Sequence, residues 1–307
     1  MHLPHNRFIR RVFCLICLSA AGIGLGRDWN SPIQLHGKSP SSLRFVVIGD
    51  RTGAGPDSWG ILDRAITETN RLKPDFAVYI GDLIDGASSP AVLKAQWDEA
   101  LRHLDSLQVP LFLVPGNHDI SNPAGRAAWI ERFGVTRQTF DFAGSRFILL
   151  DTESEAPSGR GGFGPQQTAF LKKSARSGPH TGTIFIFMHR PAWILDGPLK
   201  TEWESARPDS GVVPILVFAG HLHILAAEKR DGIRYFSVGP TGGSLRLAPN
   251  PGLGLLHHIT TVSCAGGDSV RVEFLASGRR LPESAAFEAA ERGLKTLLLL
   301  RQSRGEW

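Results

Sequence analysis

Short apolar runs that alternate with amphipathic stretches constrain the fold of this chain more than any other feature of its sequence. Continuous apolar runs of strand length are typical of strands that are buried on both faces. Each of the first three runs is followed by a stretch with helical periodicity. The order strand–helix, repeated three times, predicts an α/β unit on a mainly parallel sheet. The six segments are residues 43–49, 58–72, 75–81, 91–107, 110–116 and 124–134.

The pattern changes after residue 134, where hairpins join buried strands. Neither an internal repeat nor a strong linker follows residue 42, so we predict one α/β domain with two mixed sheets over residues 43–280. Residues 281–307 form a C-terminal helix in this prediction, which either docks on the core or contacts a second copy or a membrane surface. The expected segments are hairpins at 138–154 and 226–239, turning at Ala143–Gly144 and Asp231–Gly232, strands at 183–189, 214–221 and 257–276, and helices at 165–177 and 283–302.

The start of the chain has the layout of an export signal. Arg7, Arg10 and Arg11 precede an apolar stretch of 15 residues, 12–26, which ends in small residues. This stretch is shorter than the roughly 20 residues that a spanning helix needs. We therefore predict a signal peptide at residues 1–26 and export to the periplasm or the exterior, with an uncleaved membrane anchor as the alternative. The arginine pair also resembles a twin-arginine signal.

Charge and cysteine content argue against a nucleic-acid-binding surface and against an intrachain disulfide in the mature chain. The formal net charge is +5, and the three arginines of the signal contribute most of it because the first 26 residues contain no acid. No run of Lys or Arg elsewhere indicates a nucleic-acid surface, so no nucleic-acid partner is expected. Cys14 and Cys17 lie in the signal, which leaves Cys264 without an intrachain disulfide partner in the mature chain. Residues 27–42, rich in Ser and Pro, are predicted to be a linker.

Polar side chains of a few kinds follow five of the predicted strands. Four of these groups come directly after a glycine, which permits tight turns and close backbone approach. Ligands bind at the carboxyl ends of parallel strands in open α/β sheets, so we expect these side chains to converge. They are Asp50, Asp82, Asn117, His118, Asp119, His189, His221 and His223.

These residue types in this order predict a metal site. Each one alone has an ordinary explanation as a helix cap, a turn residue or a packed histidine. Together they offer oxygen and nitrogen ligands without a thiolate, a set that suits Mn, Fe or Zn. Carboxylates that can be shared between ions favour two ions, roughly 3.5–4 Å apart.

The motifs GD, GDLID, GNHD, MH and GHLH, in this order over residues 43–240, resemble those of the calcineurin-like metallophosphoesterases. The resemblance implies a four-layer α/β/β/α sandwich that holds two divalent metal ions. It also implies hydrolysis of phosphate mono- or diesters by a metal-bound hydroxide, with a small-molecule phosphate ester as substrate. A non-catalytic or weakly active module that binds phosphate ligands on the same fold is the alternative.

The resemblance also implies a role for each polar side chain. As metal ligands it implies Asp50 and His223 for the first ion, Asp82 between the ions, and Asn117, His189 and His221 for the second ion. His118 would protonate the leaving group or steady the phosphate, and Asp119 would orient His118. Asp85 would support the site from behind the ligands. Arg51 is a candidate phosphate clamp because guanidinium pairs bidentately with phosphate, and Arg190 is a second candidate.

One position departs from the family pattern. The first motif of the family usually runs Asp-x-His, and its His is a ligand of the first metal ion, whereas this chain has Thr52 there. The purple acid phosphatase branch supplies a Tyr from the second motif instead, but the matching residue here is Asp85. Water, the Thr52 hydroxyl or Asp85 could complete the first site, and a weakly bound first ion is the alternative.

Overall fold

The computed structural model describes residues 29–35, 42–53, 55–120, 122–154, 161–176, 182–209, 211, 213–245, 247–265 and 269–294. The predicted signal at residues 1–26 and the C-terminal residues after 294 lie outside these ranges. Among the described residues, no helix is both long and apolar enough to cross a membrane.

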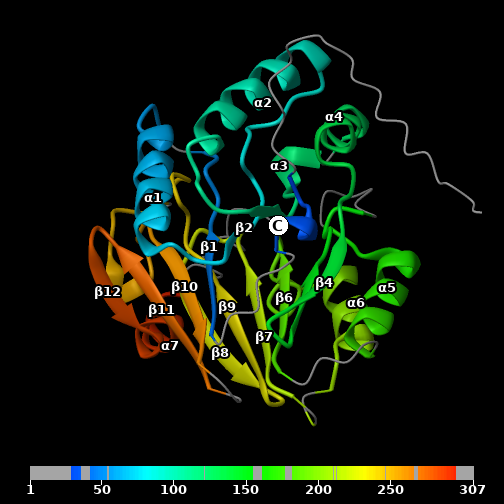
Figure 1. The fold of residues 1–307 in the computed structure, drawn as a ribbon, viewed down its shortest axis with the longest axis vertical. Coiled ribbons are helices and arrows are strands. Elements are labelled where there is room, and N and C mark those ends of the chain that lie inside the picture. The colour runs from blue at the N-terminus through cyan, green and yellow to red at the C-terminus, as the bar shows by residue number, and fades with distance from the viewer. Residues whose placement is uncertain are drawn as a thin grey trace, which may run out of the picture.

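Two six-stranded mixed sheets form the centre of the molecule (Figure 1). The first has the order β12-β11-β10-β1-β2-β3, with β1, β2 and β3 parallel and the other neighbours antiparallel. Its strands are β1 (Leu43–Ile48), β2 (Phe76–Tyr79), β3 (Leu111–Leu113), β10 (Ile259–Cys264), β11 (Val270–Ala276) and β12 (Arg279–Pro282).

The second sheet has the order β4-β5-β6-β7-β9-β8. Strands β5, β6, β7 and β9 are parallel, and β4 and β8 add antiparallel edges. The strands are β4 (Gln138–Phe142), β5 (Ser145–Leu149), β6 (Ile184–Met188), β7 (Ile215–Ala219), β8 (Ala226–Arg230) and β9 (Ile233–Ser237). Both predicted hairpins are confirmed, and Ala143 and Asp231 have the positive φ that such turns need.

Helices cover the outer faces of both sheets. Helices α1, α2 and α4 pack on the first sheet, and α5 and α6 pack on the second (Figure 1). In α2, Leu93, Trp97, Ala100 and Leu104 recur at helical spacing and are buried. The helices are α1 (Ser58–Leu72), α2 (Pro90–Leu104), α3 (Asn117–Ile120), α4 (Pro123–Phe133), α5 (Gly164–Arg176), α6 (Pro198–Ala206) and α7 (Glu283–Ala289), with short helical turns η1 (Pro32–Leu35), η2 (Pro251–Leu253) and η3 (Ala290–Leu294).

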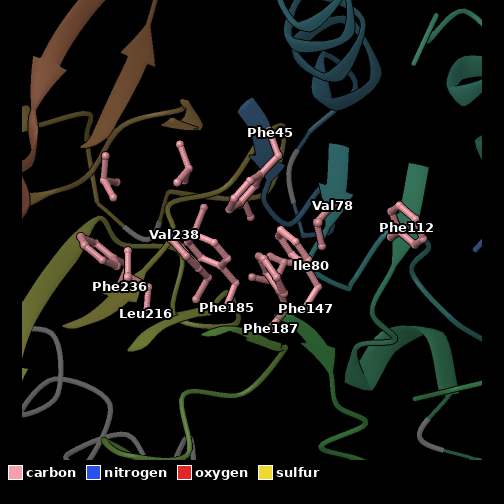
Figure 2. Packing of buried hydrophobic residues seen from close by; sticks show 14 of the residues in the cluster. Phe45, Val78, Ile80, Phe112, Phe147, Phe185, Phe187, Leu216, Phe236 and Val238 are labelled. Atoms are coloured by element: carbon pink, nitrogen blue, oxygen red, sulfur yellow. The ribbon is translucent and has the colours of Figure 1, made fainter. Parts of the chain in front are cut away.

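Aromatic side chains fill the space between the two sheets (Figure 2). Phe45 of β1 packs edge-to-face against Phe147 and Phe185 of the facing sheet, with ring centroids 5.6 and 4.9 Å apart. The neighbouring residues Val46 and Ile48 of β1 pack outward under the helices. Burial on both faces explains why the central strands β2, β6 and β7 show no polar alternation. The predicted four-layer α/β/β/α sandwich is therefore confirmed.

Four local features differ from the sequence expectation or add to it. Strand β12 and helix α6 were not predicted, because β12 is short, polar and largely exposed, and α6 is a short segment bounded by Gly197 and Arg207. Part of the predicted linker lies against the edge of β3, where the Leu113 N–H donates to Asn30 Oδ1 at 2.6 Å. In the described part of the C-terminal helix, Ala286 and Ala289 are buried, so this part docks on the core.

Candidate metal centre

The loops after five strands of the two sheets meet at one edge of the sandwich. The point of closest convergence is Nε2 of His189, at the end of β6. It lies 3.2 Å from Oδ2 of Asp82, 3.0 Å from Oδ1 of Asn117 and 3.2 Å from Nδ1 of His221. The four predicted ligands of the second metal ion are thus brought together, and Asp82, His189 and His221 offer ligand atoms that could hold one ion.

The remaining predicted ligands, Asp50 and His223, lie beside this group. His223 Nε2 is 3.1 Å from Oδ2 of Asp50, which also accepts the backbone N–H of His221 at 2.6 Å. The other carboxylate oxygen, Oδ1 of Asp50, is buried and has no hydrogen-bond partner among the described residues. A buried carboxylate oxygen without a donor is costly, so the donor set fits a cation next to Asp50.

Backbone carbonyls fix the orientation of two histidine rings. His189 Nδ1 lies 3.0 Å from the carbonyl of Ile80, and His223 Nδ1 lies 2.7 Å from the carbonyl of Ser244. A carbonyl can only accept a hydrogen bond, so Nδ1 of each ring carries a proton. The Nε2 atoms then face the carboxylates, as a metal-ligating histidine requires.

The backbone at the site adopts conformations that bring the ligands close. Asp82, His221 and His223 have positive φ angles of 56°, 66° and 56°, which are uncommon for residues with a side chain and cluster at functional sites. A Cβ atom on Gly116 would collide with the Asp82 carboxylate, and one on Gly220 would collide with that of Asp50. The glycines of the motifs are therefore required by packing against the ligands.

The electrostatics of the site favour positive charge. Burial lowers the pKa of His189, but the carboxylates of Asp82 and Asp50 outweigh it and raise this pKa to about 9. Burial raises the pKa of Asp82, but the His189 ring outweighs it and lowers this pKa to about 2. The carboxylates thus hold a proton on a buried ring, and a bound divalent cation would replace that proton.

His118 lies on the open side of the cluster, with 43% of its side chain exposed. Its Nε2 is 4.0 Å from Oδ2 of Asp82, and its Nδ1 is 2.9 Å from the carbonyl of Asp85. The ring can therefore approach a substrate from solvent while the Asp85 carbonyl holds its inner edge.

Asp119 has different partners from those expected. Its carboxylate accepts the backbone N–H groups of Asp82, Leu83, Ile84 and Gly116, at 2.9 to 3.2 Å. We correct the expectation that Asp119 orients His118, because the ring is held by the Asp85 carbonyl instead. Asp119 fixes the two loops that carry Asp82 and Asn117.

Arg51 also differs from its predicted role as a phosphate clamp. Its Nε donates to the Leu83 carbonyl at 2.6 Å, its Nη2 pairs with Asp85 at 3.0 Å, and its guanidinium lies 4.2 Å over the Trp59 ring. Only 5% of the side chain is exposed. These contacts commit Arg51 to the loop after β2 and favour a positioning role.

Thr52 is buried beside a supporting loop. Its carbonyl accepts the N–H of Ser244 at 3.1 Å. The N–H groups of Thr241 and Gly243, in the same loop, donate to the Asp50 carbonyl at 2.8 and 2.9 Å. The carboxylate of Asp85 is one of the groups that could complete the first site. In this structure it pairs with the Arg51 guanidinium.

A sixth strand end, which we did not predict to reach the site from the sequence, adds charged residues there. After β5, Glu153 pairs with Arg190, from Oε1 to Nε at 2.7 Å and from Oε2 to Nη2 at 3.3 Å. Asp151 pairs with Arg126 of α4 at 2.8 Å. The signal is present in the sequence, because the apolar run FILL also ends in an acid, but its pattern predicts only one half of a hairpin.

Comparisons with curated proteins find a phosphatase and a phosphodiesterase among the relatives of this chain. The bovine serine/threonine-protein phosphatase CPPED1 is 30% identical over 230 residues, which cover 64% of this chain and 71% of the bovine protein. The probable glycerophosphodiester phosphodiesterase GpdQ of Arcobacter nitrofigilis is 25% identical over 162 residues, which cover 51% of this chain and 54% of that protein. The match to the rat CPPED1 covers 45% of that protein.

Solved structures show the same fold. A dimetal phosphatase from Danio rerio has a TM-score of 0.57 and 18% identity, covering 78% of this chain and 98% of that one. The purple acid phosphatase PPD1 from yellow lupin has a TM-score of 0.56 and 15% identity, covering 80% and 53%. The family model described as calcineurin-like phosphoesterase matches residues 43–225, which is more than half of the chain. The chain therefore belongs to the calcineurin-like phosphoesterase family.

Proposed function

We propose that this protein hydrolyses phosphate mono- or diesters with the help of two divalent metal ions. The observation that carries the proposal is the convergence of Asp82, Asn117 and His221 on Nε2 of His189, with Asp50 and His223 alongside. The names of the relatives, a phosphatase and a phosphodiesterase, support the same reaction class.

The positions of the residues indicate which of them would hold each ion and which would donate a proton. Asp82, Asn117, His189 and His221 would hold one ion, and Asp50 and His223, with Asp82, would hold the other. Bound divalent ions would neutralise phosphoryl charge and lower the pKa of the attacking water. His118, on the open side, would donate a proton to the leaving oxygen through Nε2, since its Nδ1 faces a carbonyl.

The test is hydrolysis of an aryl phosphate monoester and an aryl phosphate diester by the purified protein with added Mn²⁺, Fe²⁺ or Zn²⁺. Asp82→Ala and His221→Ala should each abolish turnover, and Lys94→Gln, on the exposed face of α2, should not. Absence of turnover with every metal, in protein with a native circular dichroism spectrum, would reject the proposal.

The alternative is a non-catalytic module that binds phosphate ligands. The observation that favours it is Thr52 at the usual place of a histidine ligand, together with the engagement of Asp85 by Arg51. Metal analysis of the pure protein separates the two proposals. Two ions per chain support the hydrolase, whereas one ion or none, together with phosphate binding and no turnover, supports the module.

We propose further that the protein is exported, on the grounds of the N-terminal signal layout. The arginine pair can be tested directly. Replacing both Arg10 and Arg11 with Lys should block export if the twin-arginine route is used, and normal export of this variant would exclude that route.

A further inference from the structure

Trp59, the second residue of helix α1, lies against the guanidinium group of Arg51. The centre of its ring is 4.2 Å from Cζ of Arg51, which is within the range of a cation–π contact. The ring of His103, from α2, is stacked on the same Trp59 side chain with 4.5 Å between centroids. Trp59 is half-buried, whereas Trp97 and Trp129 of the nearby core are fully buried. An aromatic side chain outside the metal centre therefore contacts the first motif.

The contacts of Arg51 are of two kinds, along the edges of the guanidinium and against its face. Along the edges, Nε donates to the Leu83 carbonyl at 2.6 Å, Nη1 donates to Ser58 Oγ at 3.2 Å, and Nη2 pairs with Asp85 at 3.0 Å. These bonds restrain the group mainly within its plane. A ring stacked against the face restrains the tilt of that plane without taking a hydrogen bond. Trp59 therefore adds a restraint that the polar partners do not supply.

The tilt of Arg51 matters because Asp85 lies at the surface. The Asp85 side chain is 57% exposed, and its carboxylate pairs with Arg51. The backbone carbonyl of Asp85 holds Nδ1 of His118 at 2.9 Å. On the other side, the N–H of Gly86 donates to Gln96 Oε1 at 2.9 Å. The loop that orients His118 is thus held from two directions, and Arg51 provides one of them.

We propose that Trp59 is a positioning residue, which fixes Arg51 and thereby holds Asp85 and the His118 ring in the orientation that protonates the leaving oxygen. The inference rests on the proposed function, because it names a residue that acts through the proton donor of that same site. It predicts a loss confined to proton donation, whereas a merely structural role predicts a general loss.

The dependence of the rate on the leaving group provides the first test. A general acid accelerates the departure of a basic leaving oxygen more than that of a weakly basic one. The substrates are phenyl phosphate, whose leaving phenolate is basic, and 4-nitrophenyl phosphate, whose leaving phenolate departs without a proton. Trp59→Leu should lower kcat by about three- to tenfold for phenyl phosphate and by less than about twofold for 4-nitrophenyl phosphate. Circular dichroism and metal content are recorded for each variant.

A second aromatic–arginine contact provides the matched control. Phe170, half-buried in α5, lies under the guanidinium of Arg137 at 5.5 Å. Phe170→Leu removes a contact of the same kind and should leave the ratio of the two kcat values unchanged. Trp59→Phe keeps an aromatic face and should retain most of the wild-type ratio. Trp59→Leu combined with Arg51→Lys should lose no more than Arg51→Lys alone, because both changes act through one group.

The tautomer of His118 provides a test that needs no turnover. The Asp85 carbonyl can only accept a hydrogen bond, so it selects the neutral tautomer with the proton on Nδ1. Long-range ¹H–¹⁵N spectra of the full chain distinguish the two tautomers. Trp59→Leu should shift the proton of the neutral ring toward Nε2, because the anchor is loosened, and Phe170→Leu should not.

Two results would overturn the proposal: equal slowing of both substrates in folded Trp59→Leu, or an unchanged kcat ratio together with an unchanged His118 tautomer. If Trp59→Leu does not fold, Trp59→Met replaces it under the same criteria, since Met fills irregular space without a ring face. Absence of turnover in the wild type with every metal would reject the proposed function, and the tautomer would then decide the inference alone. Normal turnover in the wild type and in Trp59→Leu, with the same tautomer, would reject the inference and leave the proposed function standing.

Discussion

Arg51 and Asp85 form an ion pair of 3.0 Å that connects the first motif to the catalytic histidine candidate. The carbonyl of the same Asp85 lies 2.9 Å from Nδ1 of His118. The backbone N–H of Arg51 also donates to the Asp82 carbonyl at 3.1 Å. Arg51 therefore fixes the loop that carries Asp82 and the carbonyl that anchors His118.

We expect Arg51→Lys to lower kcat by about tenfold, with little change in the phosphate inhibition constant, because the His118 ring loses a fixed anchor while the phosphate site persists. Steady-state kinetics on an aryl phosphate would check this. A rise in KM and in the phosphate inhibition constant at unchanged kcat would instead support a clamp. Arg71→Lys, on the exposed face of α1, is the control.

A second prediction concerns the glycine before His221. Gly220→Ala should reduce metal affinity and destabilise the protein by about 1–3 kcal/mol, because the new methyl group meets the Asp50 carboxylate and the Ile80 side chain. Metal titration and urea unfolding would measure both effects. Gly211→Ala is the control, since a Cβ there has no heavy atom within 4 Å among the described residues. Equal behaviour of the two variants would contradict the packing argument.

The convergence of the candidate ligands could be predicted from the sequence because their signal is local. An apolar run that ends in glycine and an acid or histidine defines both a buried strand and the residue delivered by its end, as for Asp82 and His221. The roles of Arg51 and Asp119 could not be obtained in this way. Their partners, Asp85 and the N–H groups of residues 82–84, depend on how separate loops pack.

The pair of Glu153 and Arg190 shows the same limit. The two residues are 37 positions apart and are joined only because β5 and β6 are parallel neighbours whose ends coincide. Their charges alone fit solvent-exposed loops equally well. Strand β12 was missed for another reason, because its stability comes from pairing with β11 rather than from an apolar pattern.

The raised pKa of His189 predicts how the metal-free protein responds to alkaline pH. Burial opposes the charge on the ring, but Asp82 and Asp50 outweigh it and raise the pKa to about 9 from an ordinary 6.5. The contribution of this ring to stability is complete below pH 6.5 and is lost as the pH rises through about 9. Because a tenfold change in proton affinity corresponds to about 1.4 kcal/mol, we expect the free energy of unfolding in EDTA to fall by a few kcal/mol over this window.

Urea unfolding at a series of pH values would measure this loss. His189→Gln should flatten the profile between pH 6.5 and 9, whereas His103→Gln should retain it. Metal affinity should rise over the same window, because binding displaces the proton. A profile that is flat in the wild type would contradict the assignment.

Position 52 provides a test of how a first metal ion would be held in the proposed two-metal site. Thr52 is buried, two residues after Asp50, and its carbonyl is fixed by the Ser244 N–H at 3.1 Å. An imidazole there would add a nitrogen ligand where the family pattern has one. We expect Thr52→His to raise the affinity for the more weakly bound ion by at least about tenfold, the usual effect of completing a ligand set. Metal titration by calorimetry would measure it.

Thr52→Gln, of similar volume but without an imidazole, separates a ligand effect from a packing effect. Unchanged metal affinity in folded Thr52→His would mean that the side chain at position 52 points away from the first ion, whose protein ligands would then be Asp50, Asp82 and His223.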